Sequence, residues 1–124
     1  MKVNLFTLCD GAFNYNGKLT IVGTYDNLKI ANLPGKADVS VALKLEAAKE
    51  ESGNRIIVLK FQDNDSVDVV GSISLNTQLT AGEVNYIAAA LTIHGAQFSK
   101  PGAYHALVFD GDNCLLDMVF HVSE

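Results

Sequence analysis

The C-terminal segment constrains the fold most, because it has the residue pattern of a β-hairpin. Pro101 and Gly102 interrupt whatever precedes them, and the run Tyr104–Phe109 is rich in strand-forming residues. Asp110-Gly111 supplies a turn, and apolar residues then recur at every second position of Cys114–Val122. Alternation with a period of two is typical of a strand with one buried face. We therefore expect this segment to be part of a β-sheet.

The same pattern recurs along the rest of the chain. Asn16-Gly17 is a strong hairpin signal, because a type I′ turn needs a positive φ at both central residues. Glu46–Ser52 is the one helix-favouring stretch and ends within two turns, so the long helices that would indicate a parallel sheet are missing. The sequence therefore predicts an all-β fold, an antiparallel two-sheet β-sandwich of about seven to eight strands, immunoglobulin-like or jelly-roll-like. Before the terminal hairpin, the predicted strands are Lys2–Asp10, Lys18–Gly23, Tyr25–Ile30, Val39–Ala47, Arg55–Gln62, Val67–Asn76 and Val84–Ile93.

Length and composition indicate one folded domain over residues 1–124. Apolar residues make up 48% of the chain and charged residues 19%, with a net charge of -5, which fits a soluble globular protein. Arg55 is the one arginine, so the bidentate contacts of nucleic-acid binders are nearly unavailable and no nucleic-acid partner is expected. No segment resembles a signal peptide or a membrane helix, so we expect a cytoplasmic protein with no membrane partner.

Three short motifs carry a family resemblance: Leu8-Cys9-Asp10 near the start, Gly17-Lys18-Leu19 in the first hairpin, and Pro101-Gly102-x-Tyr104 at the terminal hairpin. In these residues, and over nearly its full length, the chain resembles an uncharacterised bacterial all-β family known only as a domain of unknown function. The resemblance implies a β-sandwich and no particular activity.

The number of residues in the Asp110–Asn113 turn decides which face of the terminal hairpin is buried, because one added residue reverses every side chain. An odd number places His105 directly opposite Asp117 on an outer face. The residues that then point into the core are Tyr104, Ala106 and Val108.

An even number of turn residues instead sends Leu107 and Phe109 into the core. We favour the odd number, because it keeps Asp117 away from the core. The outer face then offers a set of candidate interface residues, namely His105, Leu107, Phe109, Leu115 and Val119.

Two acidic turns offer oxygen ligands of the kind that Ca²⁺ accepts. The candidate ligands are Asp63 and Asp65 in one turn and Asp110 and Asp112 in the other, and the two turns could share an ion if both lay at one end of the sandwich. Asp, Asn and Gly are also the ordinary residues of tight turns, and that explanation needs no ion. We therefore predict no metal and no cofactor, and no motif marks a catalytic residue.

Cys9 and Cys114 fall in the first and last predicted strands. A bridge between them would close nearly the whole chain into a loop. In a reducing compartment, separated cysteines at apolar strand positions are more often buried free thiols, and we predict that state. Tyr15, in the turn of the first hairpin, is expected to be exposed, where it packs over its own hairpin or, as the alternative, anchors a contact.

The sequence names no reaction. Arg55–Gln62, Asn85–Ile93 and the terminal hairpin carry hydrophobic residues on both faces, which is more than one core needs. Such surfaces usually bind a partner, so we predict a non-enzymatic interaction or assembly module whose partner is a second copy or another protein. The alternative is a small-molecule or Ca-binding sandwich that uses its acidic end loops.

Overall fold

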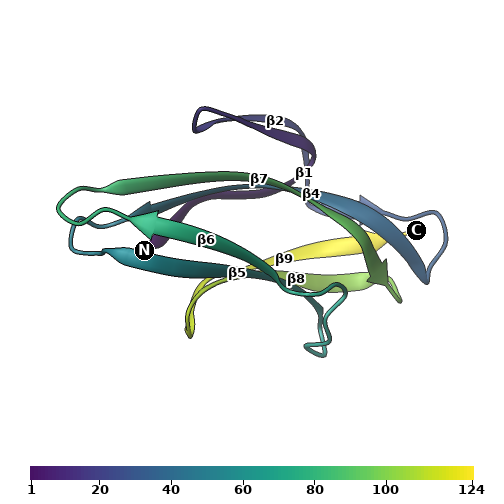
Figure 1. Ribbon diagram of the computed structural model, residues 1–124. Coiled ribbons are helices and arrows are strands. Elements are labelled where there is room, and N and C mark those ends of the chain that lie inside the picture. The colour runs from purple at the N-terminus through teal and green to yellow at the C-terminus, as the bar shows by residue number, and fades with distance from the viewer.

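Two β-sheets pack face to face in the computed structural model, which describes residues 1–124 (Figure 1). The four-stranded sheet has the spatial order β2 (Lys18–Tyr25), β1 (Lys2–Tyr15), β4 (Gly35–Ala47) and β7 (Asn85–Phe98). The five-stranded sheet has the order β3 (Asn27–Lys29), β9 (Asn113–Ser123), β8 (Gly102–Asp110), β5 (Gly53–Asp63) and β6 (Ile73–Leu79). The predicted two-sheet β-sandwich is confirmed, and it has nine strands. No helix with the length and hydrophobicity needed to cross a membrane is formed.

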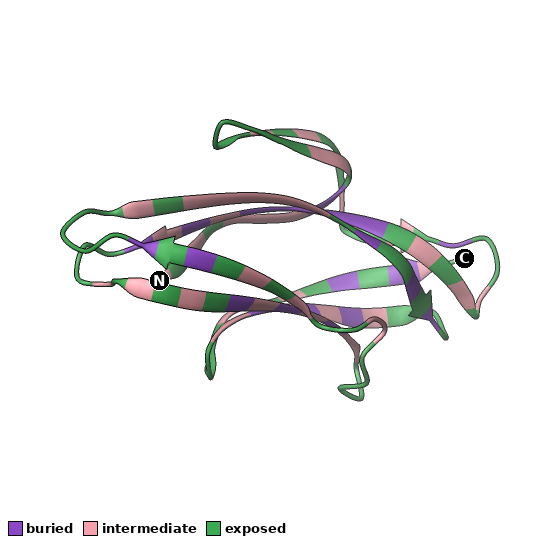
Figure 2. Ribbon diagram, viewed as in Figure 1, coloured by how far each residue is buried: buried purple, intermediate pink, exposed green.

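The core lies between the sheets, where Figure 2 shows the buried segments facing one another. Strand β4 contributes every second residue from Val39 to Leu45, as its alternation predicts. Four aromatic rings fill the centre in mostly edge-to-face contacts, which add to the energy of burial. These rings belong to Phe61, Phe98, Tyr104 and Phe120. The Tyr104 hydroxyl donates a hydrogen bond of 2.6 Å to the Lys100 carbonyl, so its polar group is satisfied.

The hairpin of β1 and β2 folds over the outer face of its own sheet (Figure 1). Strand β1 pairs with β4 as far as Cys9 and then continues with β2 to Tyr15, beyond the predicted end at Asp10. Its tip reaches across the sheet, where the Asn14 side-chain amide donates to the Ala88 carbonyl at 3.0 Å. Ser40 and Ala42, on the side of β4 that faces this hairpin, are buried.

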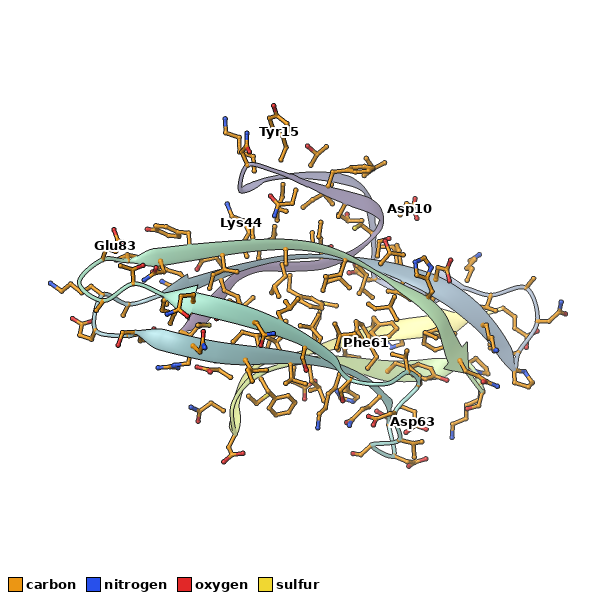
Figure 3. All side chains as sticks on the ribbon, viewed as in Figure 1. Asp10, Tyr15, Lys44, Phe61, Asp63 and Glu83 are labelled. Carbon is orange, nitrogen blue, oxygen red and sulfur yellow. The ribbon has the colours of Figure 1, made fainter.

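The turn of this hairpin has the geometry that its sequence predicts. Asn16 and Gly17 both have positive φ, at 51° and 80°. Tyr15, beside this turn, is exposed as predicted, because its side chain is 75% exposed and points away from the sandwich (Figure 3).

The chain crosses between the sheets after β2, and this crossing corrects the expectation of a wholly antiparallel sandwich. The short strand β3 runs parallel to β9, with Asn27 opposite His121 and Lys29 opposite Ser123. Since β3 reaches the sheet from the opposite layer and not through a hairpin turn, it can enter alongside β9 in the same direction.

The predicted strand Val67–Asn76 is wrong in its first half, because β6 begins only at Ile73. The Asp63 carboxylate accepts hydrogen bonds from the backbone N–H groups of Asp65 and Val67, which folds this segment into a local turn. Val69 then bonds to both sheets: its N–H donates to the Phe61 carbonyl and its carbonyl accepts from Gln97. The segment closes one side of the sandwich.

Strand β7 is longer than predicted and continues through His94-Gly95 to Phe98. Its pairing with β4 shifts register between Ala37 and Val39, and Gly95 has a φ of 69°. The glycine therefore makes a bulge where the sequence suggested an end.

Candidate functional site

The terminal hairpin has an even turn, but a β-bulge reverses the effect of that turn. Asp110 pairs with Asn113 across Gly111-Asp112, and Phe109 pairs with Cys114. Val108 then pairs with Leu116, so Leu115 is an extra residue in β9. One extra residue has the same effect on side-chain direction as a turn of odd length.

The side chains of β8 therefore point as the odd turn predicts. Tyr104, Ala106 and Val108 are fully buried, whereas the alternating residues His105, Leu107 and Phe109 lie on the outer face and are half-buried. The predicted direct opposition of His105 and Asp117 is wrong, because the register places His105 opposite Val119 and Asp117 opposite Leu107. The two side chains still meet diagonally, with 2.7 Å between His105 Nδ1 and Asp117 Oδ1.

Leu115 is not placed as predicted. As the bulged residue it is half-buried and packs against the core cluster, and Cys114 takes the position opposite Phe109. Val119 does lie on the outer face, where it is 50% exposed.

We define the outer face as the solvent-facing side of strands β5, β8 and β9. Neighbouring strands contribute its residues in register, with Val58 opposite Phe109 and Lys60 opposite Leu107. The face consists of Ile56, Val58, Lys60, His105, Leu107, Phe109, Cys114, Asp117 and Val119.

A fixed polar group stands beside the apolar residues of the outer face. The His105 ring is held at both nitrogens, by Asp117 at Nδ1 and by the Asn64 side-chain oxygen at 3.0 Å from Nε2. A histidine oriented by an aspartate is also part of hydrolase triads, but there the second nitrogen faces a nucleophilic hydroxyl or thiol. Here it faces an amide oxygen, so the arrangement positions the ring and supplies no nucleophile.

The two acidic turns lie at opposite ends of the sandwich. Asp63 of β5 pairs with Tyr104, and Asp110 pairs with Ile57 of β5. Asp63 and Ile57 are six residues apart along that strand, so the two turns lie about 20 Å from each other. The possibility that the two turns share an ion, which requires both turns at one end of the sandwich, is therefore wrong. Asp112 is exposed, and Asp65 is exposed with its carboxylate 3.9 Å from the Lys100 ammonium. The structure gathers no group of three or more His, Cys, Asp or Glu side chains that could hold a metal.

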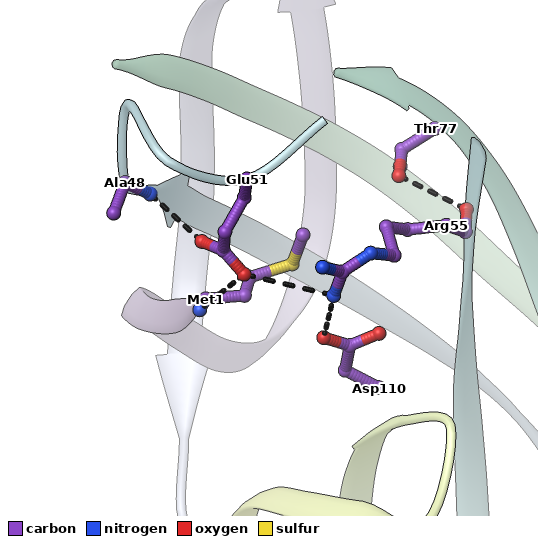
Figure 4. Close-up of polar contacts among 6 residues, drawn as sticks. All are labelled: Met1, Ala48, Glu51, Arg55, Thr77 and Asp110. Atoms are coloured by element: carbon purple, nitrogen blue, oxygen red, sulfur yellow. Dashed lines mark hydrogen bonds and ion pairs between the residues drawn. The ribbon is translucent and has the colours of Figure 1, made fainter. Parts of the chain in front are cut away.

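Asp110 belongs to an ion cluster that sequence analysis did not find (Figure 4). The Arg55 guanidinium lies 2.7 Å from an Asp110 carboxylate oxygen and 3.6 Å from Glu51 Oε1. Glu51 also accepts from the Met1 ammonium at 2.9 Å and from the Ala48 N–H. These contacts, led by the bond from the ammonium, lower the pKa of Glu51 below its usual value. The signal that could have found the cluster is that Arg55 is the one arginine of the chain.

A cleft of about 420 Å³ lies where the bent β1–β2 hairpin leaves its sheet. Its lining includes Cys9, Asp10, Tyr25 and Asp38. Burial raises the pKa of the Cys9 thiol, and burial together with the charges of Cys9 and Asp10 raises that of Tyr25. At the rim, the Gly95 N–H and then His94 lower the pKa of Asp38. A raised thiol pKa disfavours the reactive thiolate, so the cleft does not activate Cys9 as a nucleophile.

Both cysteines are free thiols, as predicted, but their environments differ. Cys9 is buried, whereas Cys114 was expected to be buried and is exposed. The bulge at Leu115 explains the difference, because it moves Cys114 from the inward row of β9 to the outer face.

We expect one thiol of each native chain to react rapidly with a thiol-specific reagent at a protein concentration low enough to keep the chains separate, and the second only on unfolding. Cys114 is accessible, whereas Cys9 is buried with a raised pKa. A colorimetric thiol assay with and without denaturant measures this. Cys114→Ser should show no rapid reaction, and equal native rates for the two thiols in the unsubstituted chain would contradict the assignment.

The fold and the site define a class, a β-sandwich with a partly apolar outer sheet face. Residues 4–123 match the model of a family of unknown function, DUF6941. The chain belongs to this family, which agrees with the all-β family of unknown function that its motifs resemble. No curated protein matches the chain.

Several solved structures are similar to the chain at low sequence identity. An immunoglobulin-like protein from Pseudomonas aeruginosa is 14% identical, with a TM-score of 0.49 over 98% of this chain and 95% of that one. A beta-glucosidase from Listeria innocua in complex with glucose is 14% identical, with a TM-score of 0.47 over 97% of this chain. This chain spans only 16% of the glucosidase. Neither likeness carries an argument about function.

Proposed function

We propose that this chain is a non-enzymatic assembly module that self-associates through the outer face of β5, β8 and β9. The observation that carries the proposal is the apolar character of that face. The solvent side of an antiparallel sheet is ordinarily polar. Here Ile56, Val58, Leu107, Phe109 and Val119 occupy outward positions, and Ile56 is 56% exposed.

The order of charges across this face supports a second copy as the partner. Lys60, Leu107 and Asp117 form one row across three neighbouring strands, so a positive and a negative side chain flank an apolar one. A two-fold axis along β8 at Leu107 sets Lys60 of each copy against Asp117 of the other. Such an isologous contact is self-complementary, and two-fold dimers are the commonest assemblies of identical chains.

The substitution Leu107→Lys tests the proposal, because it places two like charges against each other at the axis. We expect a lower molar mass than that of the unsubstituted chain in light scattering at matched protein concentrations. Val22→Lys is the control, since Val22 is 54% exposed and lies in β2 of the other sheet, away from this face. Thermal unfolding checks that both variants remain folded.

Two results would overturn the proposal. One is an unsubstituted chain that stays at 13.3 kDa over a wide range of concentration. The other is a molar mass that Leu107→Lys and Val22→Lys leave equally unchanged.

A further inference from the structure

Strand β7 forms an open edge of the four-stranded sheet, next to β4 on one side only. Its stretch Asn85–Ile93 pairs with Ala47–Val39 of β4 without a shift in register. The stretch contains no charged residue and no proline. An edge of this kind presents a row of unpaired backbone groups, which favours pairing with another strand.

The other sheet edges are shorter or differently placed. Strand β3 has three residues, and β6 has seven with polar Ser74, Asn76 and Gln78 exposed. Strand β2 is carried away from the sheet by the bent hairpin and has Lys18 at its start. Charges, short length and bending are the usual means by which proteins protect an edge. The regular part of β7 has none of these three, although the tip of the β1–β2 hairpin reaches it through the bond from Asn14 to the Ala88 carbonyl.

We propose that β7 pairs antiparallel with β7 of a second copy about a two-fold axis at Ala89, joining two four-stranded sheets into one. The turn before Asn85 and the bulge at Gly95 bound the regular stretch, and Ala89 is its midpoint. Pairing about this point brings every residue of the uncharged stretch Asn85–Ile93 into the ladder between the two copies. It sets Asn85 opposite Ile93, Tyr86 opposite Thr92, Ile87 opposite Leu91 and Ala88 opposite Ala90 of the other copy.

The side chains of β7 suit a second copy in this register. On the inner face, Ile87, Ala89 and Leu91 pack against the core but are only half-buried, so an added strand would cover them further. Every cross-strand pair is uncharged, and the central pairs are alanines that permit close approach. The Ala88 carbonyl that accepts from Asn14 keeps a second lone pair for the ladder.

Paired lysines at Tyr86 and Thr92 test this contact independently of the outer face. In one chain the two positions are six residues apart, about 20 Å along the strand, so their charges interact little. In the proposed register each lysine meets a lysine of the other copy, and like charges directly opposite one another are destabilising. The matched control is Y86K/T92E, which sets lysine against glutamate and loses the same Ser40–Thr92 hydrogen bond.

The comparison is made in the Leu107→Lys background by light scattering, so that the outer face contributes nothing. We expect L107K to be dimeric, L107K/Y86K/T92K to have half that molar mass, 13.3 kDa, and L107K/Y86K/T92E to be dimeric again. A monomeric L107K at every concentration overturns this proposal and leaves the outer-face contact standing if the unsubstituted chain is larger. Equal masses for the lysine and glutamate variants also overturn it.

A disulfide at the axis tests the register. Only the residue on the axis faces its own copy, at a separation of about 4.5–5.5 Å between Cα atoms, which a disulfide can span. We expect Ala89→Cys to form an intermolecular disulfide under mild oxidation in a Cys114→Ser background, whereas Ala88→Cys, about 8 Å from its copy, should not. Equal cross-linking of the two variants, or none, would show that this register is not formed.

Discussion

Replacement of Phe120 by alanine is expected to lower the free energy of unfolding by about 3–5 kcal/mol. Phe120 has no exposed surface, and its ring centroid lies 5.9 Å from that of Tyr104, 6.3 Å from Phe61 and 6.4 Å from Phe98. It therefore connects rings from three other strands, β5, β7 and β8. The substitution removes the contacts on every side and leaves a cavity that the β-sheet backbone can close only in part.

Denaturant unfolding at a fixed protein concentration measures this loss, because self-association would make apparent stability depend on concentration. The substitution Val22→Ala is the control, since that side chain is 54% exposed on the other sheet, outside the outer face. We expect a change below about 1 kcal/mol for the control. A loss of similar size in both variants would contradict the role of the aromatic cluster.

Replacement of Gly35 by alanine is expected to cost about 2–3 kcal/mol, although it adds a single methyl group. Gly35 begins β4, where a Cβ atom would be driven into the backbone carbonyl of Asn32 and lie 3.1 Å from Ile30 Cγ2. A backbone oxygen cannot rotate aside as a flexible side chain can. The strand start or the buried Ile30 must therefore move.

The control for this prediction is Gly71→Ala. A Cβ atom at Gly71 meets nothing within 4 Å, so alanine should be neutral or slightly stabilising through its smaller unfolded-state entropy. Thermal or denaturant unfolding of both variants gives the comparison. Equal stability of the two would show that the segment before β4 can move without cost.

Local patterns in the sequence predicted the sandwich, because the strands and turns are encoded by residues close to one another. The alternation of Val39–Leu45 and the Asn16-Gly17 turn both appear as the sequence indicates. The wrong strand start at Val67 has a local cause that alternation alone does not show. The Asp63 carboxylate bonds two backbone N–H groups and stabilises a turn where the apolar residues suggested an extended chain.

The candidate site depended on features that arise only in three dimensions. The outer face was predicted with the correct residues of β8, but Leu115 was misplaced because a bulge of one residue has no distinctive composition. The Arg55 cluster joins Met1, Glu51 and Asp110, which are far apart along the chain. The cleft beside Cys9 exists because β1 leaves its sheet midway, and no single segment of sequence encodes that bend.

The bulge at Leu115 shows that the buried face of the terminal hairpin depends on whether the number of residues between its paired positions is even or odd. Phe120 and Val122 are buried because one extra residue precedes them in β9. A two-residue turn with a bulge and a three-residue turn without one leave them in the core. A two-residue turn without the bulge would point Phe120 and Val122 outward and Asp117 and Val119 into the core, which would bury a carboxylate. Among members of this family, length changes between Asp110 and Leu116 should therefore be tolerated in steps of two residues, whatever the residues inserted.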